Sequence, residues 1–531
     1  MRYNAAADLL ERNFVAGRGA KTAFIDDRGR YTYAELADRV GRFANLLRGF
    51  DIRPEQRILL CLHDTIDFPT AFLGAIKAGV VPVAVNTQLS AAEYTFMLAD
   101  SRARAVVVSA PLLPVMTAAR AELPAPQASV IVSGADGHEQ SVTALLAEMP
   151  GAYETAPTHP DEPCFWLYSS GSTGRPKGTV HIHSNLIQTA ELYAIPVLGI
   201  VENDVVFSAA KLFFAFGLGN SLTFPMAVGA TSVLMAERPT PPAISRVLRE
   251  DRPTIFYGVP TLYNAMLAGN DLPRRDELSL RRCVSAGEPL PQEIGRRWMA
   301  RIGVDILDGI GSTEMLHIFL SNWPDCVRYG TTGKPIPGYE LNIVDEEGKS
   351  VQRGEIGDLL VSGPTSAALY WNNRERCRAT FMGRWTRTGD KYFEDEDGYY
   401  VYCGRSDDML KVSGMYVSPA EVEAALIEHD DVLEAAVVGA ADENGLIRPK
   451  AFVVMKPGIR ASEHFAPALE AHAKKLLAPF KCPRWFAFVD ELPKTATGKI
   501  QRFKLRDQAL ELPVFSSRRP DAPPRAPLAP T

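Results

Sequence analysis

Long apolar runs are missing from this sequence. The most apolar stretch covers residues 71–85, contains Lys77 and Pro82, and is too short to span a bilayer. The first residues, MRYNAAADLLERNF, carry Asp8 and Glu11 and lack the apolar core of a signal peptide. We therefore expect a cytoplasmic protein that has no membrane partner.

Paired cysteines and an excess of positive charge are missing as well. The 531 residues include seven cysteines that form no CxxC pair, so we expect reduced, mostly buried thiols. Neither these cysteines nor the nine histidines cluster with a spacing typical of metal ligands. With 57 Lys and Arg against 63 Asp and Glu, the net charge of −6 argues against a nucleic-acid-binding protein.

Apolar runs of strand length alternate with amphipathic helical patterns in the first half of the chain. This alternation predicts parallel sheets covered by helices. The expected strands are 57–62, 80–85, 105–109, 164–168, 231–235 and 254–257, and the expected helices are 68–78, 185–193 and 244–249. From about 330 to 404, short runs separated by Gly, Pro and Asp-Gly predict a β-rich part with hairpin turns.

A chain of 531 residues is too long for one core, and its pattern changes again near residue 407. We expect an α/β protein with a large N-terminal domain, residues 1–406, that includes the β-rich part. A small α+β C-terminal domain is expected at 407–515. Its helices are expected at 419–428 and 465–477, and its strands at 432–438, 450–455 and 485–489. The Pro-rich end, 516–531, is predicted to be a disordered tail.

A loop rich in Gly and hydroxyl side chains, SSGSTGRPKG, occupies residues 169–178. It is expected to follow a buried strand and to precede a helix capped by Ser184 or Asn185. Small residues let backbone N–H groups wrap a polyanion. The string differs from the G-x-x-x-x-G-K-[ST] phosphate-binding loop, so the mechanism of that loop is not assumed. We expect it to bind phosphate through Ser169, Ser170, Gly171, Ser172, Thr173, Gly174 and the positive charge of Lys177.

Together with four later motifs, this loop resembles the adenylate-forming superfamily, which includes acyl-CoA synthetases, carrier-protein adenylation domains and luciferases. The later motifs are DGIGSTE at 308–314, RTGD at 387–390, GRSDDMLK at 404–411 and PKTATGK at 493–499. They follow the superfamily's order and cover the chain from about 165 to 505. The resemblance implies an enzyme that uses ATP and Mg²⁺ to activate a carboxylic acid as an acyl-adenylate.

The resemblance also implies roles for individual residues. Asp390 would accept the ribose hydroxyls, and Arg405 would meet ribose or phosphate. Glu314 and Thr173 would hold magnesium and, with Lys499, would be catalytic, because Lys499 can span the attacking carboxylate and the α-phosphate. The remaining nucleotide-binding residues would be Ala286, Gly287, Glu288, Asp308, Gly309, Ile310, Gly311, Ser312 and Thr313. By residue type alone, Asp390 could equally cap a turn and Glu314 could begin a helix.

Three segments resemble benzoate–CoA ligases and their aryl-CoA relatives: FFAFGLGN at 213–220, SAGEPLP at 285–291 and GSTEMLHIFLSN at 311–322. By that resemblance a flat slot for an aromatic ring is lined by Ala215, Phe216, Ala286, Gly311, His317 and Ile318. His317 either positions a carboxylate or fills space. The benzoate-ligase pattern has Tyr where this chain has Phe216, so an aminobenzoate, a hydroxybenzoate or another substituted acid stays open.

We therefore expect an aryl-CoA ligase for aromatic-compound degradation, with benzoate as the first candidate acid and ATP and coenzyme A as co-substrates. The C-terminal domain would swing about a hinge at Asp407, so that Lys499 serves adenylation. Val412, Ser413 and Gly414 would then line the CoA channel. The alternatives are an adenylation enzyme that loads a carrier protein and a non-catalytic nucleotide-binding protein. A monomer or a homodimer fits equally.

Overall fold

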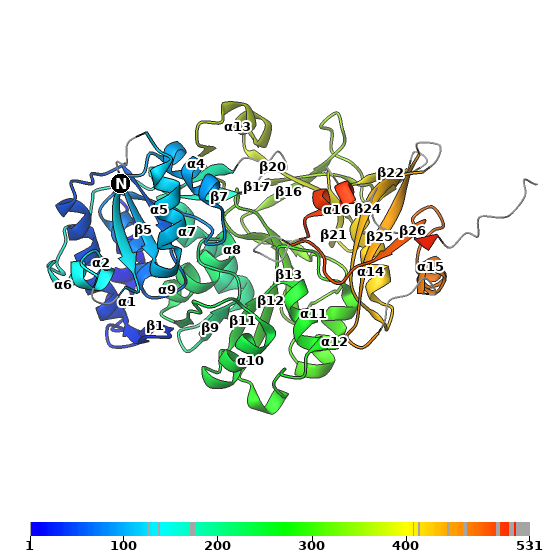
Figure 1. The fold of residues 1–531 in the computed structure, drawn as a ribbon, viewed down its shortest axis with the longest axis horizontal. Coiled ribbons are helices and arrows are strands. Elements are labelled where there is room, and N and C mark those ends of the chain that lie inside the picture. The colour runs from blue at the N-terminus through cyan, green and yellow to red at the C-terminus, as the bar shows by residue number, and fades with distance from the viewer. Residues whose placement is uncertain are drawn as a thin grey trace, which may run out of the picture. The chain divides into compact units, whose positions relative to one another are not determined.

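The computed structural model describes residues 2–124, 128–135, 138–169, 176–406, 408–412, 415–442, 446–459, 465–494, 500–508 and 515–516 (Figure 1). The chain divides into two compact units. The first comprises Met1–Leu290, Ile294–Thr388 and Glu394–Val401, and the second comprises Pro291–Glu293, Gly389–Phe393 and Tyr402–Thr531. The expected boundary between 406 and 407 stays a prediction, and the expected tail lies, apart from Ser516, outside the described residues.

One sheet of the first unit has the strand order β18-β8-β7-β4-β3-β5-β6, parallel from β7 to β6. The strands are β3 Arg57–Cys61, β4 Val81–Ala84, β5 Ala105–Ser109, β6 Ser129–Ser133, β7 Pro163–Ser169, β8 Lys177–Ile182 and β18 Leu369–Tyr370. Leu59 and Val106 pack with residues of α4 (Ala91–Ser101) and α5 (Leu113–Ala121), whereas α3 (Asp67–Lys77) also contacts β3 and β4. Helices on both faces explain why these strands are continuous apolar runs.

The second sheet has the order β15-β14-β13-β12-β11-β9-β10-β1-β2 and is parallel from β13 to β1. The strands are β1 Thr22–Asp26, β2 Gly29–Thr32, β9 Val205–Ser208, β10 Thr231–Val233, β11 Ile255–Gly258, β12 Arg282–Ser285, β13 Ile306–Gly311, β14 Ile318–Ser321 and β15 Lys334–Pro335. Phe207, Phe256 and Ile306 share a core with Ile244 of α10 (Pro241–Glu250) and Tyr263 of α11 (Pro260–Ala268). The carboxyl ends of these parallel strands lead into the candidate site.

The other helices of the first unit pack around these sheets. They are α1 Ala5–Val15, α2 Tyr33–Gly49, α6 Val142–Ala147, α7 His183–Thr189, α8 Ala215–Leu218, α9 Phe224–Val228, α12 Gln292–Ile302 and α13 Arg374–Thr380. A further sheet contains β16 Glu340–Val344, β17 Gly357–Ser362, β19 Phe381–Met382, β20 Trp385–Glu394 and β21 Tyr400–Arg405, of which Gly389–Phe393 and the residues from Tyr402 on belong to the second unit. It forms the β-rich part that the turn signals predict.

The second unit has its own core around the sheet β24-β25-β26-β27. Its elements are α14 Pro419–Ile427, β24 Val432–Ala441, β25 Ile447–Met455, α15 Phe465–Leu476, β26 Trp485–Phe488, α16 Arg502–Gln508 and β27 Phe515–Ser516, with the hairpin β22 Leu410–Val412 and β23 Met415–Val417. One face of the sheet packs on α14 and α15, and the other packs on Leu505 of α16. The α/β fold class expected from the sequence is confirmed.

One expected helix differs in the structure. The helix expected after residues 169–178 is present, but the strand β8 comes before it and pairs antiparallel with β7. Thr179, Val180 and Ile182 are β-branched and favour a strand there. The helix begins at His183, so Ser184 and Asn185 lie inside its first turn and the expected cap is wrong. The helix expected over 185–193 begins as α7 but continues as a π-helix, η2 Ala190–Leu198, which contains Pro196. Proline has no N–H and cannot continue the α-helical ladder.

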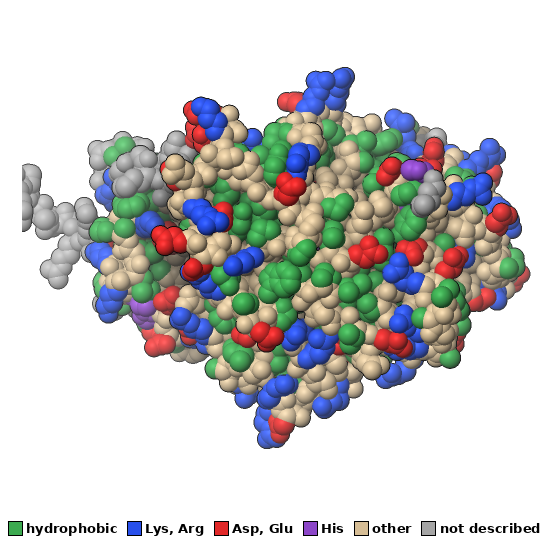
Figure 2. All heavy atoms as spheres, turned by 180° about the vertical axis from the view of Figure 1, so that it is seen from behind, with side chains coloured by type: hydrophobic (Ala, Val, Ile, Leu, Met, Phe, Trp, Pro, Cys, Tyr) green, Lys and Arg blue, Asp and Glu red, His purple; other side chains and the backbone are tan. Residues whose placement is uncertain are grey.

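Two further expectations concern thiols and membranes. All seven cysteines are free, and five of them are buried, as expected. Among the described residues, no helix has both the length and the apolar character that a bilayer crossing requires. On the face drawn in Figure 2, basic and acidic side chains are interspersed, and no large patch of one charge is seen on that face.

Candidate functional site

The two ends of the expected phosphate loop lie opposite each other in a hairpin. Ser169 ends β7 and Lys177 begins β8, and the two residues are paired across the strands. Ser170, Gly171, Ser172, Thr173 and Gly174 lie outside the described residues. The loop therefore connects two antiparallel strands rather than a strand and a helix.

Lys177 belongs to a compact charged cluster with Glu314 and Tyr370. Its Nζ lies 3.7 Å from Glu314 Oε1 and 3.3 Å from the Tyr370 hydroxyl oxygen, over the Tyr370 ring. The Tyr370 hydroxyl donates to Glu314 Oε1 at 2.6 Å. Burial, followed by the nearby negative charge of Glu314, raises the pKa of Tyr370, so the phenol stays protonated and remains a donor. The sequence reasoning missed Tyr370; its only signal was an aromatic pair, Tyr370–Trp371, beyond the motifs.

Glu314 lies in a turn that follows β13. The Ser312 hydroxyl oxygen accepts a hydrogen bond from the Met315 N–H, and Leu316 has a φ of 65°. Residues 310–314 are partly exposed, whereas 315–320 are buried. Glu314 therefore lies in a turn and does not begin a helix, so that alternative is wrong. The turn leaves its carboxylate partly accessible.

A buried histidine supports this turn. His181 on β8 places Nε2 2.8 Å from the Thr313 carbonyl oxygen and Nδ1 3.0 Å from Asn185 Oδ1. Burial lowers the pKa of His181, while the two hydrogen bonds oppose that shift. Its contact fixes the residue next to Glu314, and no motif singled out His181.

The motifs around Ala286 and Asp308 meet at the carboxyl ends of two neighbouring strands. Ser285 of β12 pairs with Asp308 of β13, and Ala286 follows directly as a buried residue. Gly287 has a φ of 95°, and Glu288 Oε2 accepts a hydrogen bond of 2.6 Å from the Thr261 hydroxyl. Burial raises the pKa of Asp308 well above its usual range. The two motifs therefore lie side by side at the carboxyl ends of parallel strands, where α/β sheets usually bind their ligands.

The expected adenine platform, Gly309–Ile310–Gly311, is the end of β13. A Cβ on Gly311 would lie 2.5 Å from the His317 carbonyl oxygen, and one on Gly309 would lie 3.0 Å from Ile318 Cγ2. Larger residues at these two positions would push β14 away. The glycines therefore make a flat strand end that lies directly against His317 and Ile318.

Phe216 and His317 of the expected aryl slot contact each other, and Phe224, which was not expected there, also contacts His317. The Phe216 and His317 ring centroids are 5.5 Å apart, and the Phe224 and His317 centroids are 4.5 Å apart. His317 Nε2 lies 3.1 Å from Asn220 Oδ1 and 3.3 Å from the Phe216 carbonyl oxygen. Ala215 begins α8 directly before Phe216, and both are partly exposed, so this side of the slot is accessible.

His317 itself is fully enclosed, with 2% of its surface exposed. Burial lowers its pKa to about 3. At neutral pH the ring is uncharged, because desolvation disfavours the imidazolium. Asn220 and Phe224, which contact this ring, were not singled out by the sequence reasoning although Asn220 closes the FFAFGLGN motif.

The expected ribose-binding pair lies in the second unit. Asp390 is 6% exposed, and Arg405 Nη1 donates to its Oδ1 at 3.0 Å. Gly389 has a φ of 76°, and a Cβ there would lie 2.9 Å from Arg405 Nη2. The glycine of the RTGD motif thus lets the guanidinium approach the carboxylate.

Several expected residues of the second unit are not available for comparison. Asp407, Ser413, Gly414 and Lys499 lie outside the described residues. Val412 is fully buried and packs in the core with Val417 and Val422. The Val412 side chain is thus held by the core, and the expected CoA channel at 412–414 stays a prediction.

Magnesium would have to be held by few protein groups. In the part of the chain that the structure describes, no group of three or more His, Cys, Asp or Glu side chains could hold a metal ion. Glu314 supplies a single carboxylate, one oxygen of which accepts the Tyr370 hydroxyl. Such a donor set fits Mg²⁺ only when substrate phosphates and water complete its ligands.

Comparison with known proteins gives two family matches and close relatives. The AMP-binding enzyme family matches residues 11–371, and the AMP-binding enzyme C-terminal domain matches residues 421–499. The benzoate–CoA ligase of Thauera aromatica is 64% identical over 507 residues, which cover 95% of this chain and 96% of the relative. The 4-hydroxybenzoate–CoA/benzoate–CoA ligase of Rhodopseudomonas palustris is 50% identical over 519 residues, 96% of this chain and 94% of the relative. A crystal structure of a benzoate CoA ligase from Burkholderia xenovorans LB400 has 56% identity and a TM-score of 0.90, over 95% of this chain and 100% of that chain.

Proposed function

Because the chain belongs to the AMP-binding enzyme family, we propose that it is an ATP-dependent, AMP-forming aryl-CoA ligase with benzoate as its acid. The benzoate carboxylate attacks the α-phosphorus of ATP, which gives benzoyl-AMP and pyrophosphate. The thiol of coenzyme A then attacks the acyl carbon, which gives benzoyl-CoA and AMP. Benzoate is the acid named for the Thauera and Burkholderia relatives.

One observation carries the proposal: residues 311–318 contact a charged cluster at Glu314 and an aromatic cluster at His317. Glu314 in this segment faces Lys177 and Tyr370, the charged side. His317 and Ile318 lie against Phe216 and Gly309, the apolar side. A flat acid can therefore place its ring against Phe216 and direct its carboxylate toward the charged side.

Each charged residue has a proposed task. Lys177 and the loop before it bind the β- and γ-phosphates, and Glu314 with Thr173 holds Mg²⁺. Asp390 accepts the ribose hydroxyls, and Arg405 orients it. Lys499 stabilises the charge that accumulates during adenylation, and the second unit turns about Asp407 for thiol transfer. A cytoplasmic location and a monomer or homodimer remain predictions.

Phe216 supports a second candidate, a ligase for a hydroxy- or amino-substituted benzoate. Its ring offers no hydroxyl, and an apolar pocket discriminates weakly against near-isosteres. The Rhodopseudomonas relative is named for both benzoate and 4-hydroxybenzoate. A Phe216→Tyr variant adds the hydroxyl and should lower kcat/KM for the ring-substituted acid more than for benzoate.

The test is a panel of acids assayed for AMP release with and without coenzyme A. The panel holds benzoate, 2-aminobenzoate, 4-hydroxybenzoate and a medium-chain fatty acid. CoA-dependent release that is fastest with benzoate supports the proposal. Fastest release with the fatty acid contradicts the aryl slot, and adenylate formation that CoA does not accelerate favours a carrier-protein acceptor.

A further inference from the structure

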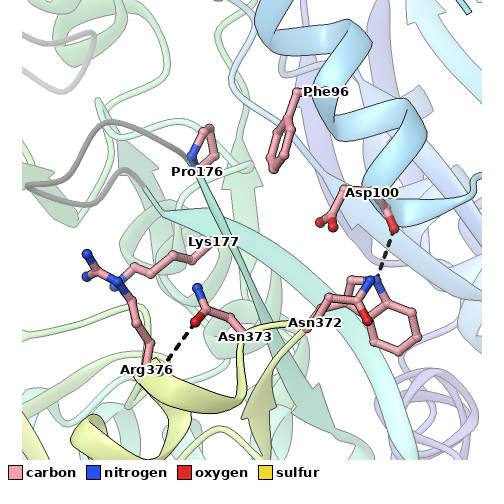
Figure 3. A pocket seen from close by; sticks show the side chains of 8 residues that line it. Phe96, Asp100, Pro176, Lys177, Asn372, Asn373 and Arg376 are labelled. Atoms are coloured by element: carbon pink, nitrogen blue, oxygen red, sulfur yellow. Dashed lines mark hydrogen bonds between the residues drawn. The ribbon is translucent and has the colours of Figure 1, made fainter.

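A small pocket is lined by Lys177 together with residues that have been given no role so far. Phe96 and Asp100 of α4 form one wall, and Asn373 and Arg376 at the start of α13 form the opposite wall (Figure 3). Its volume is about 240 Å³. Ligand pockets for drug-sized molecules have roughly 300–1,000 Å³, so this pocket suits a smaller ligand.

Positive charge is concentrated on one side of the pocket. Lys177 and Arg376 both line the pocket, and Figure 3 shows Asp100 on the opposite wall. The hydroxyl oxygen of Tyr370 lies 3.3 Å from Lys177 Nζ, and the next residue, Trp371, lines the pocket. Two cations that line the same small pocket favour a polyanion between them.

The walls of the pocket are fixed before any ligand arrives. Trp371 Nε1 donates to the Asp100 carbonyl oxygen at 3.0 Å, which ties the segment before α13 to α4. Asn373 Oδ1 accepts from the Arg376 backbone N–H, and α4 begins with a capping box between Ser90 and Glu93. Preorganised walls lower the entropy that a bound ligand costs.

Asp100 gives the pocket its polarity. Its Oδ2 accepts a hydrogen bond of 2.6 Å from the Tyr168 hydroxyl, so the carboxylate is held on the wall opposite the cations. An anion is thereby directed to Lys177 and Arg376 rather than to the centre of the pocket. Of the substrates and products of the proposed reaction, pyrophosphate is the small polyanion that is produced beside Lys177 and must leave.

We propose that this pocket is a pyrophosphate subsite, in which Arg376 receives the product from Lys177 after adenylation. The inference rests on the proposed function. When the carboxylate oxygen bonds to the α-phosphorus, the bond from that phosphorus to the bridging oxygen breaks, and pyrophosphate leaves with the electron pair. Lys177 lies at both the proposed phosphate site of ATP and the pocket, so the departing pyrophosphate can stay in contact with Lys177 while it binds Arg376.

The test measures inhibition by pyrophosphate in the full-length enzyme. Initial rates of benzoyl-CoA formation are recorded at fixed Mg²⁺ with increasing pyrophosphate, for the wild type, Arg376→Ala, Arg376→Lys and Arg378→Ala. Arg378 lies on the same helix but is exposed and does not line the pocket, so its variant removes the same charge elsewhere. Arg376→Ala should raise the inhibition constant roughly fivefold, the size of one partly screened charge pair. Arg376→Lys should raise it less, and KM for ATP should stay within about twofold.

An unchanged inhibition constant in Arg376→Ala, or an equal rise in Arg378→Ala, overturns the subsite. So does orthophosphate inhibition that Arg376→Ala weakens as much as pyrophosphate inhibition, since the site would then bind phosphate from solution. If Arg376→Ala yields no folded protein, Arg376→Gln repeats the measurement with a polar side chain of similar reach. Benzoate-dependent exchange of pyrophosphate into ATP by the wild type separates the two claims: its absence refutes the proposed function, and its presence leaves the subsite to be decided by Arg376.

Discussion

The hydroxyl of Tyr370 can be removed without changing the shape of the site. It donates to Glu314 Oε1 at 2.6 Å and lies 3.3 Å from Lys177 Nζ. A Tyr370→Phe variant keeps the ring under the ammonium but leaves Glu314 without this donor. The carboxylate is then free to approach Lys177, now 3.7 Å away, and to draw it from the phosphates.

The size of the effect follows from the kind of hydrogen bond. A hydrogen bond to a charged group contributes about 1.5–3 kcal/mol to stability. The Glu314 and Lys177 side chains are 16% and 14% exposed, so solvent screens part of the interaction and the lower value applies. About 1.4 kcal/mol corresponds to a tenfold change in rate, and we expect kcat/KM for ATP to fall about tenfold.

The assay is pyrophosphate release at saturating benzoate with varied ATP and fixed Mg²⁺. Tyr399→Phe is the matched control, since that hydroxyl lies in the same unit, at the surface, 3.4 Å from the Cys326 carbonyl oxygen. It should leave kcat/KM for ATP unchanged. The reasoning fails if Tyr370→Phe also stays within twofold of the wild type, or if it raises KM for benzoate while KM for ATP is unaltered.

Three other substitutions test the remaining parts of the site. Lys499→Ala should slow benzoyl-AMP formation roughly 10²–10³-fold while transfer from added benzoyl-AMP to CoA is less affected, which single-turnover measurements of both half-reactions check. Asp390→Asn should raise KM for ATP about tenfold and abolish the preference for ATP over 2′-deoxy-ATP; a preference that survives would remove the ribose assignment. The unfolded chain takes up a proton on His317 below its usual pKa of 6.5, whereas the folded protein, with a pKa of about 3, does not. The free energy of unfolding should therefore fall by about 2 kcal/mol from pH 7 to pH 5, and urea titrations of His317→Gln should lack this part of the decrease.

Apolar periodicity correctly predicted those helices and strands whose apolar residues are buried in the core. The strands β3, β5 and β7 and the helices α3 and α10 lie where apolar periodicity predicts them, because helices cover both faces of each parallel sheet. β8 was missed because Ser184 and Asn185 resemble helix caps, whereas the β-branched residues of 179–182 favour a strand. The π-helix η2 was missed because no periodicity distinguishes it from an α-helix.

Contacts between residues far apart in the chain limit how much of the site the sequence can predict. The motifs predicted Lys177, Glu314 and Asp390 as site residues, because each of them lies in a short string of characteristic sequence. Tyr370 contacts Lys177 across 193 positions of the chain, and His181 contacts Thr313 across 132. Such pairs are made by the order of strands in a sheet, β8 beside β18 in the first case, and nothing in the local sequence of either partner indicates the other.

The protonation of His317 decides between the two tasks that the sequence left open for it. Nε2 faces two oxygen acceptors, the Phe216 carbonyl and Asn220 Oδ1. Asn220 is held in this orientation because its Nδ2 donates to Ser208 Oγ, whose hydroxyl donates to the Ala210 carbonyl. The hydrogen-bond network therefore assigns the ring proton to Nε2 and leaves Nδ1 with a lone pair.

A neutral ring in this tautomer cannot balance a carboxylate by charge. Transferring a carboxylate into the apolar part of the slot without a cation would cost several kcal/mol. Under the proposed function, the acid should therefore enter ring first, with the ring against Phe216 and the carboxylate left toward the Glu314 turn. Lys177 lies there, 3.7 Å from Glu314, and the proposal assigns the charge that develops during adenylation to Lys499 because the neutral His317 could not offset it.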